Sequence, residues 1–183
     1  RATCSMRRSD IAAIYNPDYI IPPKTPALKT PENVTSGINV SWNKVDGAQK
    51  YYVYRKTSGT SWSSIAEVTS TSYVDKTAKS GSTYTYTVRA VNKGIAGGYD
   101  KNGKSIKRLA DTKVTSVTNV TSGITVKWSR VAGAAGYYVY RKTSTGSWSR
   151  IAELKGVSTL GYTDTKASAG VTYIYTVRPY SGN

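Results

Sequence analysis

The chain has 183 residues, enough for one or two small domains, and 26 Lys and Arg against 10 Asp and Glu give it a net charge of +16. It contains no His and a single Cys, Cys4, which excludes a Cys–His nucleophile pair and an intrachain disulfide. No apolar run reaches the roughly 18 residues that a membrane-spanning helix needs. The positive charge favours polyanionic neighbours such as acidic glycans, or it is simply a solvated basic surface.

The first segment, residues 1–24, shares no pattern with the rest of the chain. It holds two short apolar runs, which contribute Ile11, Ile14, Tyr15, Tyr19, Ile20 and Ile21. Pro22, Pro23 and Pro26 follow, and proline cannot join a central strand because it lacks an N–H donor. The sequence therefore predicts an extended leader over residues 1–24.

The remainder of the chain is a duplication. Tyr51–Ser58 returns letter for letter as Tyr137–Ser144, 86 residues later. Between Val34–Val68 and Val120–Leu154, 24 of 35 positions are identical. A repeat of this length indicates two copies of a whole domain rather than a solenoid, whose units usually span about 20–50 residues. We expect domain boundaries at residues 25–110 and 111–183.

In chain order, the first repeat shows short stretches of alternating polarity separated by turn residues. The predicted strands are Ala27–Lys29, Ile38–Trp42, a strand from Tyr51 to Tyr54, Trp62–Val68, Thr71–Asp75, Thr83–Asn92 and Ser105–Leu109. Gly94–Gly98 is expected to be a flexible loop. Seven strands, no helical stretch and turn signals every 8–12 residues or so predict an all-β chain of two-sheet sandwiches.

The second repeat copies this order, with a three-residue insertion in Lys155–Gly161, but it has no equivalent of Ser105–Leu109. Its last strand is therefore expected to be missing. One explanation is that the sequence was cut inside a domain. The other is donor-strand exchange, in which Ile11, Ile14, Tyr15, Tyr19, Ile20 and Ile21 of one copy fill the groove of the next and build a fibre.

Several motifs resemble the fibronectin type III module. They are Val40-Ser41-Trp42, Ala48–Arg55, Tyr73-Val74-Asp75 and Ser80–Asn92, each with its copy in the second repeat. The resemblance implies that Trp42 and Trp128 fill the cores and that Tyr84 and Tyr173 form tyrosine corners. Their composition also resembles tandem modules in secreted or surface proteins of gut Firmicutes. This module serves as spacer, adhesin or enzyme accessory, so the resemblance alone does not give a function.

The sequence offers no catalytic, metal or cofactor site. Histidine, the commonest general base and metal ligand, is absent. The acidic residues are mostly isolated, so neither a glycosidase dyad nor a calcium loop is expected. The glycine-rich Gly94–Gly98 lacks the Lys-Ser/Thr ending of a phosphate-binding loop. We expect neither an enzyme nor a cofactor.

Aromatic residues on the outward face are the remaining candidates for binding. Alternation directs Tyr51 and Val53 to the core and leaves Tyr52 and Tyr54 outside. The candidate ligand-binding residues are Tyr52, Tyr54, Trp62 and Arg89, with their copies Tyr138, Tyr140, Trp148 and Arg178. Aromatic rings beside a cation suit a sugar or an anionic glycan. Alternatively, these side chains only stabilise an exposed sheet. Scattered cations disfavour nucleic acid.

These features predict a non-catalytic extracellular module of a bacterial secreted or cell-wall-associated protein. Its expected partners are a glycan, an anionic cell-wall polymer or another surface protein. The alternative is a subunit of a surface fibre or adhesin that self-associates through residues 11–21 by donor-strand exchange. Cys4 lies outside both repeats, and we assign it no role.

Overall fold

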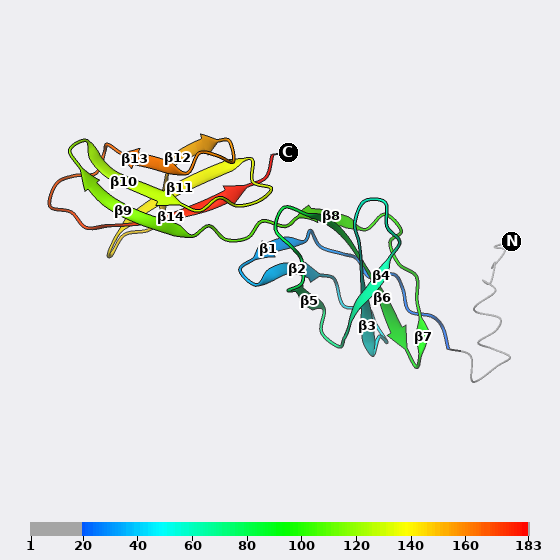
Figure 1. Ribbon diagram of the computed structural model, residues 1–183. Helices are drawn as coiled ribbons and strands as arrows, with labels where there is room; N and C mark the ends of the chain where they lie inside the picture. Colours follow the sequence, from blue (N-terminus) through cyan, green and yellow to red (C-terminus); the bar gives the residue numbers. More distant parts are fainter. Residues whose placement is uncertain (1–19, 183) are drawn as a thin grey trace, which may run out of the picture. The chain divides into compact units, whose positions relative to one another are not determined.

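The computed structural model of the chain describes residues 20–182 (Figure 1). Ile11, Ile14, Tyr15 and Tyr19 of the predicted donor strand lie outside the described residues. Ile20 and Ile21 are not part of any strand, and the side chain of Ile21 is 57% exposed. Donor-strand exchange therefore stays a prediction.

The first repeat forms two antiparallel sheets (Figure 1). One sheet has the order β1-β2-β5, and the other has the order β4-β3-β6-β7, with β8 also paired to β6. The strands are β1 (Glu32–Val34), β2 (Gly37–Ser41), β3 (Lys50–Lys56), β4 (Ser63–Val68), β5 (Ser72–Asp75), β6 (Thr83–Asn92), β7 (Ile95–Ala96) and β8 (Lys104–Lys107).

The second repeat has the same plan, except that no strand of residues 20–182 corresponds to β7 or β8 beside its β14. Its sheets have the orders β13-β10-β9 and β12-β11-β14. The strands are β9 (Val114–Val120), β10 (Gly123–Trp128), β11 (Gly136–Thr143), β12 (Ser149–Lys155), β13 (Gly161–Asp164) and β14 (Tyr173–Tyr180). The predicted all-β architecture of two tandem sandwiches is thus confirmed.

Alternation along the strands fills most of both cores, although Thr87 and Val91 on β6 are also buried, at 1% exposure each. Tyr51 and Val53 on β3 are 2% and 0% exposed, whereas Tyr52 and Tyr54 are only partly buried. The predicted core tryptophans, Trp42 and Trp128, are also buried. The other buried apolar residues of the two repeats include Ile38, Val40, Tyr86, Val88, Ala90, Val126, Val131, Tyr137, Val139, Tyr175 and Val177. The period of two in the sequence therefore predicts which face is buried.

The first strand differs between the repeats because of one residue. Pro31 stands where the second repeat has Val117, and β9 runs unbroken through Val117. In the first repeat the same stretch is split into an isolated bridge between Leu28 and Trp42 and the short strand β1. Proline cannot donate to a ladder, so the predicted strand Ala27–Lys29 is reduced to that bridge.

The segment Gly94–Gly98 is not the flexible loop that its glycines predict. Lys93 and Gly94 both have positive φ, 45° and 80°, as a two-residue type I′ turn requires. The turn lets β7 pair back on β6, with Asn92 opposite Ile95. The amide N–H of Lys93 also donates to the side chain of Gln49. Gly94 therefore serves a tight hairpin, whereas Gly97 and Gly98 follow β7.

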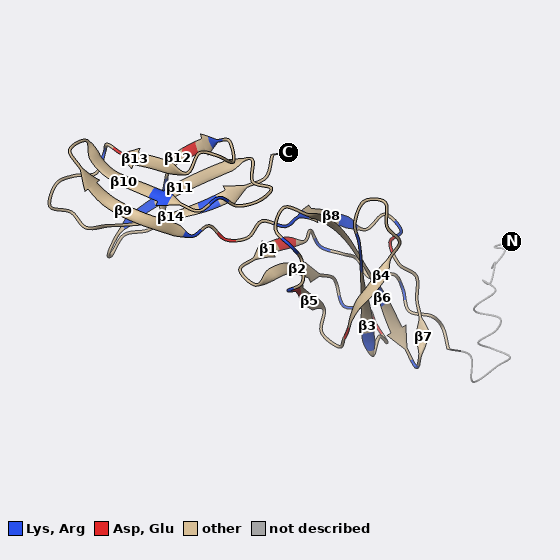
Figure 2. Ribbon diagram, in the orientation of Figure 1, with Lys and Arg blue, Asp and Glu red and all other residues tan. Residues whose placement is uncertain are grey.

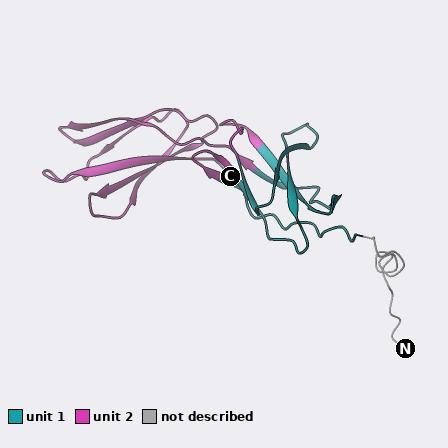
Figure 3. Ribbon diagram, turned by 90° about the horizontal axis from the view of Figure 1, so that it is seen from below, with its two compact units in different colours: residues 1–32, 39–74, 84–105 teal, residues 33–38, 75–83, 106–183 magenta. Residues whose placement is uncertain are grey.

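Two compact units divide the chain by their internal contacts (Figure 3). One comprises residues 1–32, 39–74 and 84–105, and the other comprises residues 33–38, 75–83 and 106–183. Lys and Arg recur along both sandwiches, and Asp and Glu are fewer (Figure 2). Across residues 20–182, no helix is long and apolar enough to cross a membrane.

Candidate functional site

The outward face of the sheet β4-β3-β6 brings together the aromatic and basic residues that the sequence singles out in the first repeat. On this sheet Tyr52 lies opposite Arg89 and Tyr54 lies opposite Thr87 in the β3–β6 register. The β3–β4 pairing shifts by a bulge between Val53 and Tyr54. A bulge increases the local twist and re-aims the side chains around it.

Three of these predicted residues line a hollow of about 110 Å³, which we call the aromatic hollow. Its walls are Tyr54, Trp62, Thr87, Arg89 and Tyr99. The rings of Trp62 and Tyr99 have centroids 6.5 Å apart and planes at 82° to one another, so they form a corner. The ring contact of Trp62 is thus with Tyr99, although the sequence suggested Tyr54 as its partner.

Tyr99 is the residue that sequence reasoning missed. It is held beside β6 by backbone contacts on either side of it. The Gly97 N–H donates to the Ala90 carbonyl over 2.8 Å, and the Thr87 hydroxyl donates to the Asp100 carbonyl over 2.8 Å. The only sequence signal was an aromatic residue in an otherwise small and polar connection, directly after the glycines of the hairpin.

Two cations flank the aromatic corner. The Nζ atom of Lys56 lies 4.5 Å from the centroid of Trp62, and the guanidinium carbon of Arg89 lies 5.6 Å from the centroid of Tyr99. Nε of Arg89 donates to the carbonyl of Gly97 over 2.9 Å, which fixes the guanidinium in this position. No carboxylate lines the hollow. Its chemistry is therefore apolar faces with positive charge at both sides.

Tyr52 lies outside the hollow. The Nζ atom of Lys50 lies 5.4 Å from the centroid of Tyr52 and forms a 2.9 Å ion pair with Glu67. The hydrogen bond with Glu67 raises the pKa of Lys50. This face of Tyr52 therefore contacts side chains of the chain itself.

In the second repeat the equivalent aromatics contact the protein's own side chains. Arg178 lies over Tyr140, with the guanidinium carbon 5.5 Å from the ring centroid, and Arg150 lies over Tyr138 at 4.7 Å. The ring of Tyr180 stacks on Tyr138 at 4.6 Å between centroids and 24° between planes. These contacts cover the tyrosine faces that the sequence offered to a ligand.

Trp148 is the most exposed aromatic residue of the predicted set, at 44%. The Nζ atom of Lys142 lies 5.2 Å from its ring centroid, as Lys56 lies over Trp62. Among the residues that the structure describes, Trp148 has no aromatic neighbour corresponding to Tyr99. The two repeats therefore share a Lys–Trp pair and differ in what surrounds it.

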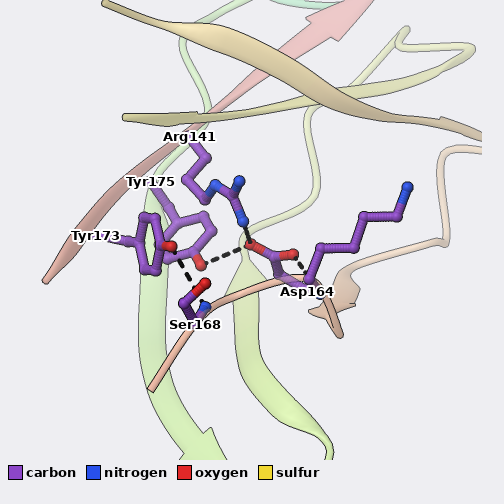
Figure 4. A network of polar contacts seen from close by, with 6 residues as sticks. Arg141, Asp164, Ser168, Tyr173 and Tyr175 are labelled. Atoms are coloured by element: carbon purple, nitrogen blue, oxygen red, sulfur yellow. Dashed lines mark hydrogen bonds and ion pairs between the residues drawn. The ribbon is translucent and has the colours of Figure 1, made fainter. Parts of the chain in front are cut away.

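A second polar cluster lies in the second sandwich and is buried (Figure 4). Asp164, only 1% exposed, accepts hydrogen bonds from Arg141 over 2.7 Å, from Tyr175 over 2.8 Å and from the Lys166 N–H over 3.1 Å. Burial alone raises the pKa of Asp164, but the bonds from Tyr175 and Arg141 outweigh it and lower that pKa. The pKa of Tyr175 is raised, by burial and by its bond to Asp164. Both carboxylate oxygens are used within the fold, which makes this cluster a structural clamp.

The tyrosine corner that the resemblance implied lies beside this clamp. The hydroxyl of Tyr173 accepts a hydrogen bond from the Ser168 N–H over 3.3 Å, five residues upstream (Figure 4). The guanidinium of Arg141 covers the Tyr173 ring at 4.5 Å, as that of Arg55 covers Tyr84 at 4.8 Å. Tyr173 thus ties the strand β14 to the turn before it.

The sheet orders, the buried tryptophans and the tyrosine corner define the class of protein. The chain consists of two tandem immunoglobulin-like sandwiches of the fibronectin type III kind. The resemblance stated from the sequence is therefore confirmed.

Comparison with known proteins gives the following similarities. No protein-family model matches the chain. Exoglucanase B of Cellulomonas fimi is 28% identical over 199 residues, which cover 93% of this chain, and the chain spans only 16% of the length of that relative. A two-domain fibronectin type III segment of chicken tenascin covers 87% of this chain and is itself covered to 91%, with 18% identity and a TM-score of 0.41. An Fn3-like protein from Clostridium thermocellum is 32% identical, covers 42% of this chain and is covered to 81%, with a TM-score of 0.35.

Proposed function

We propose that this chain is a non-catalytic, extracellular module of a bacterial secreted or cell-surface protein, and that it binds glycan or cell-wall polymer weakly through the aromatic hollow. The observation that carries this proposal is the corner of Trp62 and Tyr99 with Tyr54 and Arg89 beside it. The likeness to an exoglucanase supports a setting in carbohydrate-acting proteins. In this proposal the two modules span residues 25–110 and 111–183.

A sugar ring suits such a corner because its C–H faces are apolar and its hydroxyls lie at the rim. Aromatic rings bury those faces, and nearby polar groups orient the ligand. A hollow of about 110 Å³ is small beside the roughly 300–1,000 Å³ of sites that enclose a ligand. It accepts one part of a sugar residue, so we expect a weak affinity that a polymer raises through repeated contacts.

The non-catalytic part of the proposal rests on chemistry. The sequence has no His to act as a base. The buried carboxylate of Asp164 is held by three donors inside the fold and is not available to a substrate. The hollow itself contains no acidic group that could protonate or attack a glycosidic bond.

Binding of the full chain to a set of soluble and insoluble glycans and cell-wall polymers tests the proposal. Trp62→Ala should weaken binding about ten-fold, because it removes one wall of the corner. Trp148→Ala is the matched comparison, because it removes a Lys-covered tryptophan that lacks a Tyr99 equivalent, and we expect a smaller loss. Thermal melts check that both variants fold. Binding that Trp62→Ala leaves unchanged, or no binding to any polymer, would leave the chain as a spacer.

A further inference from the structure

We infer that the aromatic hollow takes a sugar residue that carries an acidic group, a carboxylate or a phosphate, within a saccharide polymer. This inference rests on the proposed function and gives it a substrate class. It comes from the charge around the hollow, from the way Arg89 is held, and from the shape of the aromatic corner.

The charge around the hollow is positive and is not neutralised by its neighbours. Lys56 lies over Trp62 and Arg89 lies against Tyr99, so one cation stands at each side of the corner. Among residues 20–182, neither Lys56 nor Arg89 forms an ion pair with a carboxylate, and Glu67 pairs instead with Lys50 over 2.9 Å. A neutral sugar would leave both cations without an anionic partner, whereas an acidic one complements them.

The guanidinium group of Arg89 is held so that its two terminal nitrogens are available to a ligand. Only Nε is used by the protein, in the 2.9 Å bond to the Gly97 carbonyl. Among residues 20–182, Nη1 and Nη2 have no hydrogen-bond partner. A guanidinium anchored through Nε offers these two nitrogens as a planar fork, which matches the two oxygens of a carboxylate or phosphate. Such a bond is stronger than one between neutral groups.

The shape of the corner favours a sugar over a nucleobase as the carrier of that acid. The planes of Trp62 and Tyr99 stand at 82°, so no two parallel faces lie side by side. A flat base could stack on only one of the rings, and so would gain only one of the stacking contacts, each worth about 1–3 kcal/mol, on which single-strand binding relies. A puckered sugar ring has C–H bonds on its face and at its edge, so it can contact both rings of the corner.

The test compares four probes on the intact chain: polygalacturonate for a carboxylate, poly(glycerol phosphate) for a phosphate, a neutral β-glucan, and single-stranded oligo(dT). Affinity electrophoresis and calorimetry are run at low and at physiological salt. We expect at least one acidic polymer to bind about ten-fold more tightly than the neutral glucan and the oligo(dT). The two acidic probes then distinguish a carboxylate from a phosphate.

Variants distinguish specific binding by the planar fork of the Arg89 guanidinium from attraction by the basic surface as a whole. Arg89→Gln should lose about ten-fold in affinity for the acidic polymer and keep any affinity for the neutral one. Arg89→Lys keeps the charge but not the fork, and we expect an intermediate loss. Lys127→Gln, at an exposed position on β10, removes the same charge elsewhere and should change affinity less than about two-fold.

Each contrary outcome has a distinct meaning. Equal binding of neutral and acidic polymers, reduced by Trp62→Ala, overturns the acidic assignment and leaves the proposed function standing. Absence of binding to every saccharide overturns both. Tightest binding to oligo(dT) replaces the sugar with a nucleic acid. An equal loss in Lys127→Gln and Arg89→Gln overturns the fork, because attraction by the whole basic surface then suffices.

Discussion

The two sandwiches agree inside and differ on their outward faces. In the first, Trp42 and Tyr51 meet with centroids 5.3 Å apart and planes at 61°; in the second, Trp128 and Tyr137 meet at 5.6 Å and 60°. The hydroxyl of each core tyrosine accepts a 3.0 Å hydrogen bond from a valine N–H, at Val45 and Val131. Close packing leaves these positions no freedom to change separately.

On the outward faces, substitutions at matching positions decide what covers each tyrosine. Lys50 of the first repeat lies over Tyr52, but the second repeat has Gly136 at that position, and Tyr180 stacks on Tyr138 instead. Arg150 replaces Ser64 and covers the same tyrosine from the neighbouring strand. The two repeats therefore share a core, whereas their outward sheet faces differ, and among residues 20–182 only the first repeat has the aromatic hollow.

The largest expected effect comes from truncating the buried tryptophan that both cores share. Trp42→Ala and Trp128→Ala should each destabilise its own sandwich by about 3–5 kcal/mol, the usual cost of truncating a buried tryptophan. The loss is mainly of packing, because each indole Nε1 is buried with no hydrogen-bond partner among the described residues. Scanning calorimetry of the full chain should show one transition shifted in each variant, and a different one in each. A shared shift would contradict the independence of the two cores.

A smaller effect is expected at the clamp in the second sandwich. Asp164→Asn removes the charge that Arg141 and Tyr175 share, at a cost of about 2 kcal/mol at pH 7. The folded-state pKa of Asp164 is lowered, so its stabilisation is present above the unfolded pKa of about 3.9 and is lost as pH falls through the folded value. Wild-type chain should therefore lose stability below about pH 4, and the variant should lose less.

Thermal melts at pH 7 and pH 3 measure this difference. Glu153→Gln is the matched control, because its carboxylate is exposed and lies 3.9 Å from Arg150. An exposed pair of this kind contributes at most about 1 kcal/mol, so the control should melt close to wild type at both pH values. An Asp164→Asn variant as sensitive to acid as the wild type would show that other carboxylates set the acid response.

Local pattern predicted the fold and three of the five residues that line the aromatic hollow. Alternation placed Tyr51 in the core and Tyr54 and Arg89 outside, because side-chain direction in a strand depends only on parity. Tyr99 could not be found in this way. Its position depends on hydrogen bonds to β6 from a segment with no alternation, such as that between Gly97 and Ala90.

The contrast between the two faces was also beyond sequence reasoning. Arg89 and Arg178 occupy matching positions, yet one is held by the Gly97 carbonyl and the other lies over Tyr140. The difference lies in which neighbours reach the guanidinium, and only the folded arrangement fixes those neighbours. Likewise, the partners of Asp164 come from two other strands, Arg141 from β11 and Tyr175 from β14, and the sequence pattern does not show that they meet.

The smallest expected effect is a coupling free energy between two substitutions, Gly136→Lys and Tyr180→Val, which give the outward face of the second sandwich the residues of the first. A Cβ at Gly136 would clash with the Leu154 carbonyl and with the ring of Tyr180, so Gly136→Lys should force that ring off Tyr138. Tyr180→Val alone should cost about 0.5–1.5 kcal/mol, the usual contribution of an aromatic pair.

The double variant recreates the first repeat's pair of Lys50 and Val91, which lie opposite each other across β3 and β6. It should be more stable than the sum of the single variants by about 1 kcal/mol, because the lysine fills the space that the ring leaves and covers Tyr138 as Lys50 covers Tyr52. Urea denaturation of all four chains measures this coupling, and purely additive losses would mean that each tyrosine face is covered independently of the residue beside it.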